Sequence, residues 1–286
     1  MAVQLRDRRG LLKPILTAHL LPVIEGHLLE LLRSLTAGEW EAQTVAPEWK
    51  VKDVAAHLLD TQLRKLSLVR DGYTAGPPPV FHSADEFVAF INRLNREGVS
   101  MYRRLSPAVL IAMMEIASRE SAEFHQALDP MALAAFSVSW AGEEASLNWF
   151  DTARELTERW HHQQQIRLAA NRPGIMTREL YYPVLDCFMR ALPFKYREQA
   201  GEPETHLRFN VSGECGGSWY LYRDGDRWVQ VEAPQGRQIS ETTIPQEIAW
   251  RIFTKGIDRE FAAAQVSVIG DRQLGLHVLR MVSIIG

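Results

Sequence analysis

From Phe150 to Ala170 the chain reads FDTARELTERWHHQQQIRLAA, a strongly helical pattern. We predict a helix from about Ser146 to Ala170, because the Asn-Arg-Pro-Gly sequence that follows cannot continue one. This long helix limits its part of the chain to a helical fold, and the rest of the sequence is interpreted around it.

Glu158 and His162 lie four residues apart in this helix and therefore share one face. A carboxylate and an imidazole so placed can hold one divalent metal ion if a third ligand arrives from another element. The alternative is a solvated face on which the two side chains pair weakly. His161 lies roughly 100° around the helix from His162, so the two histidines cannot both face one ion. Helical phase does not choose between them, because Glu158 can pair at i+3 or i+4.

Apolar residues at helical spacing, capping serines and helix-breaking prolines predict further helices before residue 200. We place them at residues 12–35, 51–70, 83–105, 106–128 and 177–197. Pro22 is expected to kink or divide the first of these helices. His57 lies beside the apolar stripe of the second, where a core histidine bonded to a backbone carbonyl is the alternative to a metal ligand.

The character of the sequence changes near residues 201–203. Short runs of alternating apolar and polar residues follow, and YRDGDRW is a hairpin signal. Thr243 and Gln246 are expected to open a helix, and residues 266–269 to form a short strand before a closing helix. Four aromatic residues can fill a small core or line a cavity for an apolar ligand; these are Trp219, Trp228, Trp250 and Phe253. We predict two domains, a helical metal-binding domain at 1–200 and an α+β domain at 201–286.

Composition excludes several classes of function. The chain has 32 basic and 35 acidic side chains and a net charge of −3, so no basic field favours nucleic acid. The N-terminal MAVQLRDRRG and the broken apolar run after it fit neither a signal peptide nor a membrane span. Cys187 and Cys215 fall in different predicted domains, which argues against a disulfide framework and favours a cytoplasmic protein. Cys187 is expected to be a buried core residue rather than a nucleophile.

Several motifs carry a family resemblance. Residues 48–58, EWKVKDVAAHL, resemble the tryptophan, aspartate and histidine-leucine signature of the mycothiol-dependent maleylpyruvate isomerase family. The pair Glu158 and His162 is similar to the second ligand motif of that family, and His57 to the first. Residues 266–274, VSVIGDRQL, look like the end of its second domain. Upstream, three further residues match the family pattern: Leu35, Trp40 and Thr44.

The resemblance implies a DinB-like four-helix bundle followed by a small α+β domain similar to sterol-carrier-type folds. It also implies a divalent metal ion, commonly zinc, held by His57, Glu158 and His162, and so it favours His162 over His161. In the family, a low-molecular-weight thiol such as mycothiol adds to maleylpyruvate, the double bond becomes rotatable, and elimination gives fumarylpyruvate. We therefore expect a metal-dependent, thiol-using isomerase or S-transferase that acts on a small molecule, for example a dicarboxylate.

Two positions depart from the family pattern: Lys50 replaces a small N-capping residue, and Gln165 lies where many relatives carry an acidic residue. Four helical arginines can face a dicarboxylate or be solvated, namely Arg64, Arg70, Arg154 and Arg167. The alternative function, from a different class, is a non-catalytic metal-binding or small-ligand-binding module with the same fold. Charged groups that converge on the metal would favour the enzyme.

Overall fold

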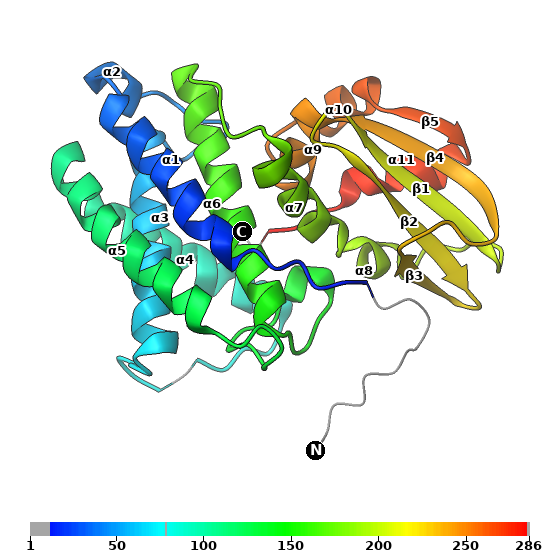
Figure 1. Cartoon of the computed structure of the whole chain (residues 1–286), viewed down its shortest axis with the longest axis horizontal. Coiled ribbons are helices and arrows are strands. Elements are labelled where there is room, and N and C mark those ends of the chain that lie inside the picture. Colours follow the sequence, from blue (N-terminus) through cyan, green and yellow to red (C-terminus); the bar gives the residue numbers. More distant parts are fainter. Residues whose placement is uncertain (1–11, 78, 285–286) are drawn as a thin grey trace. The chain divides into compact units, whose positions relative to one another are not determined.

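A computed structural model describes residues 12–77 and 79–284 (Figure 1). The N-terminal MAVQLRDRRG, on which the signal-peptide prediction depends, lies outside the described residues. The chain forms two compact units. The predicted division at residue 200 and the cytoplasmic location stay predictions. Among the described residues, every helix is too short or too polar to cross a membrane.

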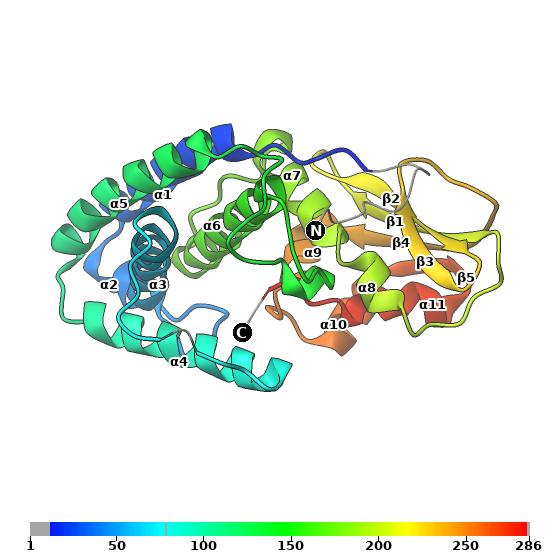
Figure 2. The ribbon, with the colours of Figure 1, turned by 90° about the horizontal axis from the view of Figure 1, so that it is seen from below.

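The first unit is helical and comprises Leu16–Val138, Glu144–Val184 and Ile284. Its core is a four-helix bundle of α1, α3, α5 and α6, in which each helix contacts its two neighbours (Figure 1). Helix α4 packs on α3, on the side away from α5 (Figure 2). The helices are α1 (Leu21–Ser34), α2 (Ala37–Trp40), α3 (Val51–Lys65), α4 (Ala84–Tyr102), α5 (Pro107–Ala127) and α6 (Asn148–Ala170).

Most helix boundaries in this unit follow from local sequence signals. Ser83 and Ser106 cap α4 and α5, each accepting a hydrogen bond from a backbone N–H three residues later. Asn171 ends α6 in the left-handed conformation, with φ of 52°. Pro22 was expected to kink or divide the helix predicted at 12–35. In the structure a short 3-10 turn at Ala18–Leu20 comes first, and α1 begins at Leu21. Pro22 lies in the first turn of α1, where its missing N–H has no partner to lose.

The bundle core is mainly aliphatic and draws side chains from all four helices. Leu28, Leu58, Met114 and Ile166 come from α1, α3, α5 and α6, and each is at most 1 % exposed. Burial of each such side chain contributes about 1.5–3 kcal/mol to the free energy of unfolding. Ile166 follows His162 by about one turn of α6, so packing of the bundle core fixes this helix close to His162.

The second unit contains Leu185–Ser283, Ser139–Glu143 and the described residues before Leu16. Its five-stranded sheet has the order β3-β2-β1-β4-β5, and only the β1–β4 pair is parallel among the described strands. The strands are β1 (Thr205–Ser212), β2 (Gly217–Asp224), β3 (Arg227–Val231), β4 (Arg237–Pro245) and β5 (Ser267–Gly270). The predicted YRDGDRW hairpin is the β2–β3 connection. A mainly helical chain with a C-terminal α+β part confirms the predicted fold class.

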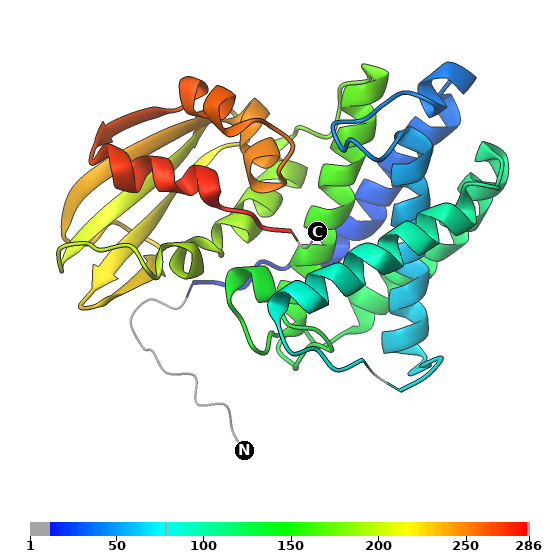
Figure 3. The ribbon, with the colours of Figure 1, turned by 180° about the vertical axis from the view of Figure 1, so that it is seen from behind.

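Short helices complete this unit: α8 (Leu192–Tyr196), α9 (Gln246–Phe253), α10 (Arg259–Gln265) and α11 (Arg272–His277). Helix α11 lies across one face of the sheet (Figure 3). The predicted helix at 177–197 is divided, because α7 (Arg178–Met189) ends before Pro193 starts α8. The four aromatic residues named above are all buried in this unit, as a filled core requires.

Strand β4 was not predicted from the sequence, and Thr243, taken as a helix start, lies within it. Its buried face carries two hydroxyl residues, Ser240 and Thr242, and one large apolar residue, Ile244, so hydropathy gives only a weak strand signal. The two hydroxyls are satisfied by carbonyl oxygens of the α11 segment, at 2.8 and 3.1 Å. Close packing here requires Gly275, because a Cβ at that position would lie 2.8 Å from either hydroxyl oxygen.

Candidate metal centre

Helix α3 carries His57, and its N-cap residue is Lys50. A lysine side chain has no hydrogen-bond acceptor, so it cannot cap the helix. Asp53 makes a capping contact instead, because its carboxylate accepts a hydrogen bond from the backbone N–H of Lys50 at 3.1 Å. The guanidinium of Arg103 donates to the same carboxylate at 2.7 Å. The aspartate of the signature therefore fixes the start of α3 one turn before His57.

The tryptophan of the signature borders the site. The ring centroid of Trp49 lies 4.7 Å from that of His57 and 5.9 Å from that of His162. The loop before α3 is held by Thr44, whose buried hydroxyl donates to the carbonyl oxygen of Trp49 at 2.7 Å. Trp49 thus forms an aromatic wall beside both imidazoles.

Three side chains from α3 and α6 converge on one point. The Nε2 atom of His57 lies 3.1 Å from Oε1 of Glu158, and Nε2 of His162 lies 3.2 Å from the same oxygen. The candidate ligand atoms all lie within 4.8 Å of one another. Both histidines are buried, whereas 26 % of the Glu158 side chain is exposed. The structure brings together the three residues that the sequence indicated.

His161 points elsewhere, although it is adjacent to His162 and buried. Its Nδ1 atom lies 2.8 Å from the carbonyl oxygen of Thr157, one turn earlier on α6. Because a carbonyl oxygen only accepts, that nitrogen carries the proton and the ring is held against its own helix. His161 lies outside the group of three that can hold an ion.

The electrostatics of the group favour a cation. Burial lowers the pKa of His57 to about 4, so this imidazole is neutral at pH 7. Burial would raise the pKa of Glu158, but the charge and hydrogen bond of His162 and the hydrogen bond of His57 outweigh it and hold that pKa well below its usual value. Burial also lowers the pKa of His161 to about 3. At neutral pH the Glu158 carboxylate is therefore ionised and faces the neutral imidazole of His57.

The donor set fits a divalent ion such as zinc, which binds imidazole nitrogen and carboxylate oxygen. Three protein ligands leave a position for water or another small ligand, as in catalytic rather than structural zinc sites. The Nδ1 atom of His57 is buried and has no hydrogen-bond partner within the described residues. The Nδ1 atom of His162 lies 2.8 Å from Oε1 of Gln165. Both Nε2 atoms are the ones that face the shared carboxylate.

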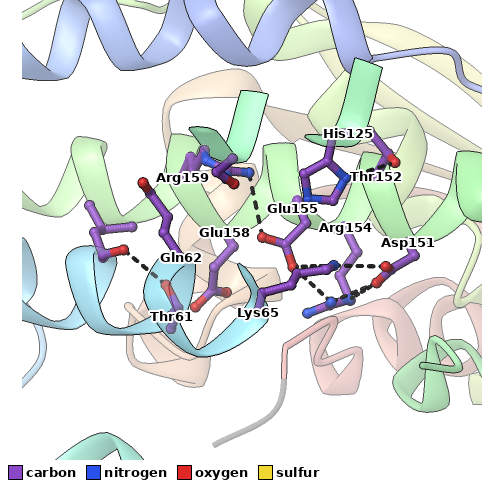
Figure 4. A network of polar contacts seen from close by, with 12 residues as sticks. Thr61, Gln62, Lys65, His125, Asp151, Thr152, Arg154, Glu155, Glu158 and Arg159 are labelled. Carbon is purple, nitrogen blue, oxygen red and sulfur yellow. Dashed lines mark hydrogen bonds and ion pairs between the residues drawn. The ribbon is translucent and has the colours of Figure 1, made fainter. Parts of the chain in front are cut away.

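A buried ionic network lies next to the site and was not predicted from the sequence (Figure 4). Lys65 of α3 reaches across to α6 and contacts Asp151 at 2.7 Å and Glu155 at 2.9 Å. Arg154 pairs with both carboxylates from the same helix. One feature of the sequence is consistent with this network: Lys65 lies two helical turns after His57, and therefore on a similar side of α3. The network fixes the pair of helices that carry the three converging side chains.

The arginines considered for a dicarboxylate are all engaged within the helical unit. Arg167 donates to backbone carbonyl oxygens. The other three form ion pairs: Arg64 with Asp60, Arg70 with Asp71 and Glu120, and Arg154 with Asp151 and Glu155. Arg64 and Arg154 are nevertheless close enough to influence His57 and Glu158 electrostatically.

Comparison with known proteins identifies the fold. Residues 22–167 match the family model described as the mycothiol maleylpyruvate isomerase N-terminal domain. The chain belongs to this family. The matched segment contains all three converging residues and the Trp49 loop. The family that the sequence motifs resemble is thereby confirmed, and a search of curated proteins gives no match.

Two solved structures match most of the chain. One is a histidine-to-alanine mutant of the mycothiol-dependent maleylpyruvate isomerase, with a TM-score of 0.52 and 11 % identity over 88 % of this chain and 90 % of that one. The other is the mycothiol-dependent maleylpyruvate isomerase, with a TM-score of 0.49 and 12 % identity over 82 % and 86 % of the two chains. At this identity the first likeness shows a shared fold.

Proposed function

We propose that the chain is a divalent-metal-binding, thiol-dependent enzyme that resembles maleylpyruvate isomerase, or a related thiol S-transferase. The observation that carries this proposal is the convergence of two imidazole Nε2 atoms on the carboxylate of Glu158, at 3.1 and 3.2 Å. His57, Glu158 and His162 are the proposed ligands, and zinc is the proposed ion because it accepts this donor set. Family membership supports a thiol cofactor such as mycothiol.

When bound, a divalent ion at this site lowers the pKa of a coordinated thiol and polarises a carbonyl group. The residues of the chain prepare the site for it. Glu158 supplies one negative charge, the two histidines supply imidazole nitrogens, and the ring of Trp49 lies beside both imidazoles. The proposed reaction is addition of a thiolate to one carbon of a cis double bond, rotation about the resulting single bond, and elimination of the thiolate to leave the trans isomer.

A second candidate function is a metal-binding or small-ligand-binding module without this chemistry. It is favoured by one observation, that the four helical arginines considered above already have partners in the helical unit. A dicarboxylate substrate would have to displace a carboxylate from Arg64 or Arg154, or use cations from other parts of the chain. The two candidates differ in whether a thiol and a cis-enoyl diacid are turned over by the metal-loaded protein.

Elemental analysis of purified protein tests the proposal. The wild type should contain about one divalent ion per chain, and His57→Ala, Glu158→Ala and His162→Ala should each lose it. His161→Ala is the matched control and should retain its metal, because its imidazole is turned toward Thr157. Full metal content in the His57 and His162 variants would refute the site. If both lose metal, a screen of thiols with cis-enoyl diacids separates the enzyme from the binding module.

A further inference from the structure

The two proposed histidine ligands, His57 and His162, differ in the hydrogen bonding of their Nδ1 atoms. His162 and Gln165 lie one turn apart on α6, and Nδ1 of the imidazole is 2.8 Å from Oε1 of the amide. Both side chains are buried, at 7 % and 6 % exposed. An amide oxygen can only accept a hydrogen bond, so Nδ1 of His162 must carry the ring proton. When the ring is neutral, as a metal ligand must be, its lone pair is then on Nε2.

This tautomer has a consequence at Glu158. In the neutral tautomer the Nε2 lone pair of His162 faces Oε1 of Glu158 at 3.2 Å, so two acceptors approach each other in a partly buried place. Such a contact is unfavourable unless a proton or a metal ion lies between the two atoms. Gln165 therefore holds His162 in the form that a cation requires, before any cation binds.

His57 shows the contrasting case. Its Nε2 atom lies 3.1 Å from the same carboxylate oxygen, and its Nδ1 is buried without a partner in the described part of the chain. Nothing there prevents Nε2 of His57 from carrying the ring proton and donating it to Glu158. The two imidazoles therefore differ: among the described residues, Nδ1 of His162 has a hydrogen-bond acceptor and Nδ1 of His57 has none.

We propose that Gln165 is a positioning residue that fixes the Nδ1–H tautomer and the ring orientation of His162, and so preorganises the metal site. This inference rests on the proposed function for its role in metal binding, but the tautomer is a property of the metal-free protein. Partners behind a ligating histidine orient the ring, and their loss typically costs about 10–100-fold in metal affinity.

The neighbouring glutamines provide controls within the same helical turn. Gln164 donates through Nε2 to the carbonyl oxygen of Gly174 at 3.0 Å, and so points away from the site. The amide of Gln163 is completely buried and has no partner among the described residues. Of the three consecutive glutamines, Gln165 is the one whose amide contacts a proposed ligand.

Two measurements test the inference. Nitrogen-15 NMR of the metal-free wild type, with the His162 ring assigned by comparison with His162→Ala, should show the proton on Nδ1, and Gln165→Leu should shift the population toward Nε2. Competition with a zinc chelator should show affinity reduced by about 10–100-fold in Gln165→Leu. Gln165→Glu keeps an acceptor and should bind zinc at least as tightly as the wild type. Gln164→Leu is the control and should bind zinc with wild-type affinity.

A proton on Nε2 of His162 in the metal-free wild type would overturn the inference, because the amide would then donate rather than accept. Wild-type zinc affinity in Gln165→Leu would also overturn it. A wild type that binds no zinc would refute the proposed function instead, and the NMR result would still decide whether Gln165 sets the tautomer. Thermal unfolding of each variant confirms that the comparison is made between folded proteins.

Discussion

The ammonium group of Lys65 lies 2.7 Å from the carboxylate of Asp151, although 86 residues separate the two in the sequence. Lys65 follows His57 by two turns on α3, and Asp151 precedes Glu158 by two turns on α6. The ion pair and the His57–Glu158 contact are therefore two points along the same antiparallel helix pair. A change in how α3 packs on α6 at the Lys65–Asp151 ion pair should therefore also displace His57 relative to Glu158.

We expect Lys65→Met to destabilise the protein. Lys65 is 8 % exposed and contacts two carboxylates, so its loss leaves buried negative charge that Arg154 only partly compensates. Breaking a buried ion pair by removal of one partner costs about 3–5 kcal/mol. Urea unfolding followed by circular dichroism should show this decrease, and zinc affinity should fall as well because α3 is no longer held against α6.

Lys50→Met is the matched control for that variant. Lys50 forms an ion pair with Glu41 in which both side chains are at least half exposed. Exposed pairs contribute about 0–1 kcal/mol, so this substitution should leave the unfolding midpoint almost unchanged. Equal midpoints for the two methionine variants would show that the buried network does not stabilise the helix pair.

Two glycines in helices should respond to alanine in opposite ways. A Cβ at Gly98 of α4 would lie 2.3 Å from the carboxyl carbon of Asp60 on α3, whereas a Cβ at Gly26 of α1 meets nothing within 4 Å. We expect Gly98→Ala to destabilise by about 1–3 kcal/mol through overpacking of the α3–α4 contact. Gly26→Ala should stabilise by about 0.5–1 kcal/mol through reduced backbone entropy.

Denaturant titrations of the two variants, with m-values checked for constancy, measure this contrast. The sign of the change matters more than its size, because both substitutions raise helix propensity by the same amount. A Gly98→Ala protein as stable as Gly26→Ala would mean that Asp60 can move aside, and that the close approach of α4 to α3 is not required.

The sequence was sufficient to place the helix that carries Glu158 and His162, because i to i+4 spacing and the terminating Asn-Arg-Pro-Gly are local signals. Helical spacing was not sufficient to choose between His161 and His162, since both spacings from Glu158 are compatible with a helix. Within the sequence, the family resemblance favoured His162. The choice comes from contacts beyond the helical pattern. Thr157 holds the ring of His161, and the partner of Glu158 across the bundle is His57.

The same limit explains the parts of the site that were missed. Lys65 was missed because a lysine on a helix is most often solvated, so its spacing from His57 does not by itself indicate a role. Gln165 was noted from the sequence as a departure from the family pattern, without a role. Their roles depend on which helices become neighbours. Strand β4 was missed for a related reason, since the hydroxyls on its buried face are satisfied only by the α11 segment that folds onto it.

Acid should destabilise the protein through its buried histidines, and His125 is the one best suited to show this. Burial lowers its pKa from 6.5 to about 3, with the charge of Lys65 acting in the same direction. The unfolded chain binds a proton at this residue near pH 6.5, whereas the folded protein does not until about pH 3. Between these values the unfolded state holds more protons, so the free energy of unfolding decreases as the pH falls.

We therefore expect His125→Gln to flatten the dependence of stability on pH between 6.5 and 4. One proton taken up on unfolding gives a slope of about 1.4 kcal/mol per pH unit, and the variant should lose up to that amount of slope. His27→Gln is the control, because the side chain of His27 is 45 % exposed. Urea titrations at several pH values measure the slopes. If His125→Gln keeps the wild-type slope, His125 is not neutral in the folded protein, and the polar network around Lys65 does not carry the charges that its ion pairs indicate.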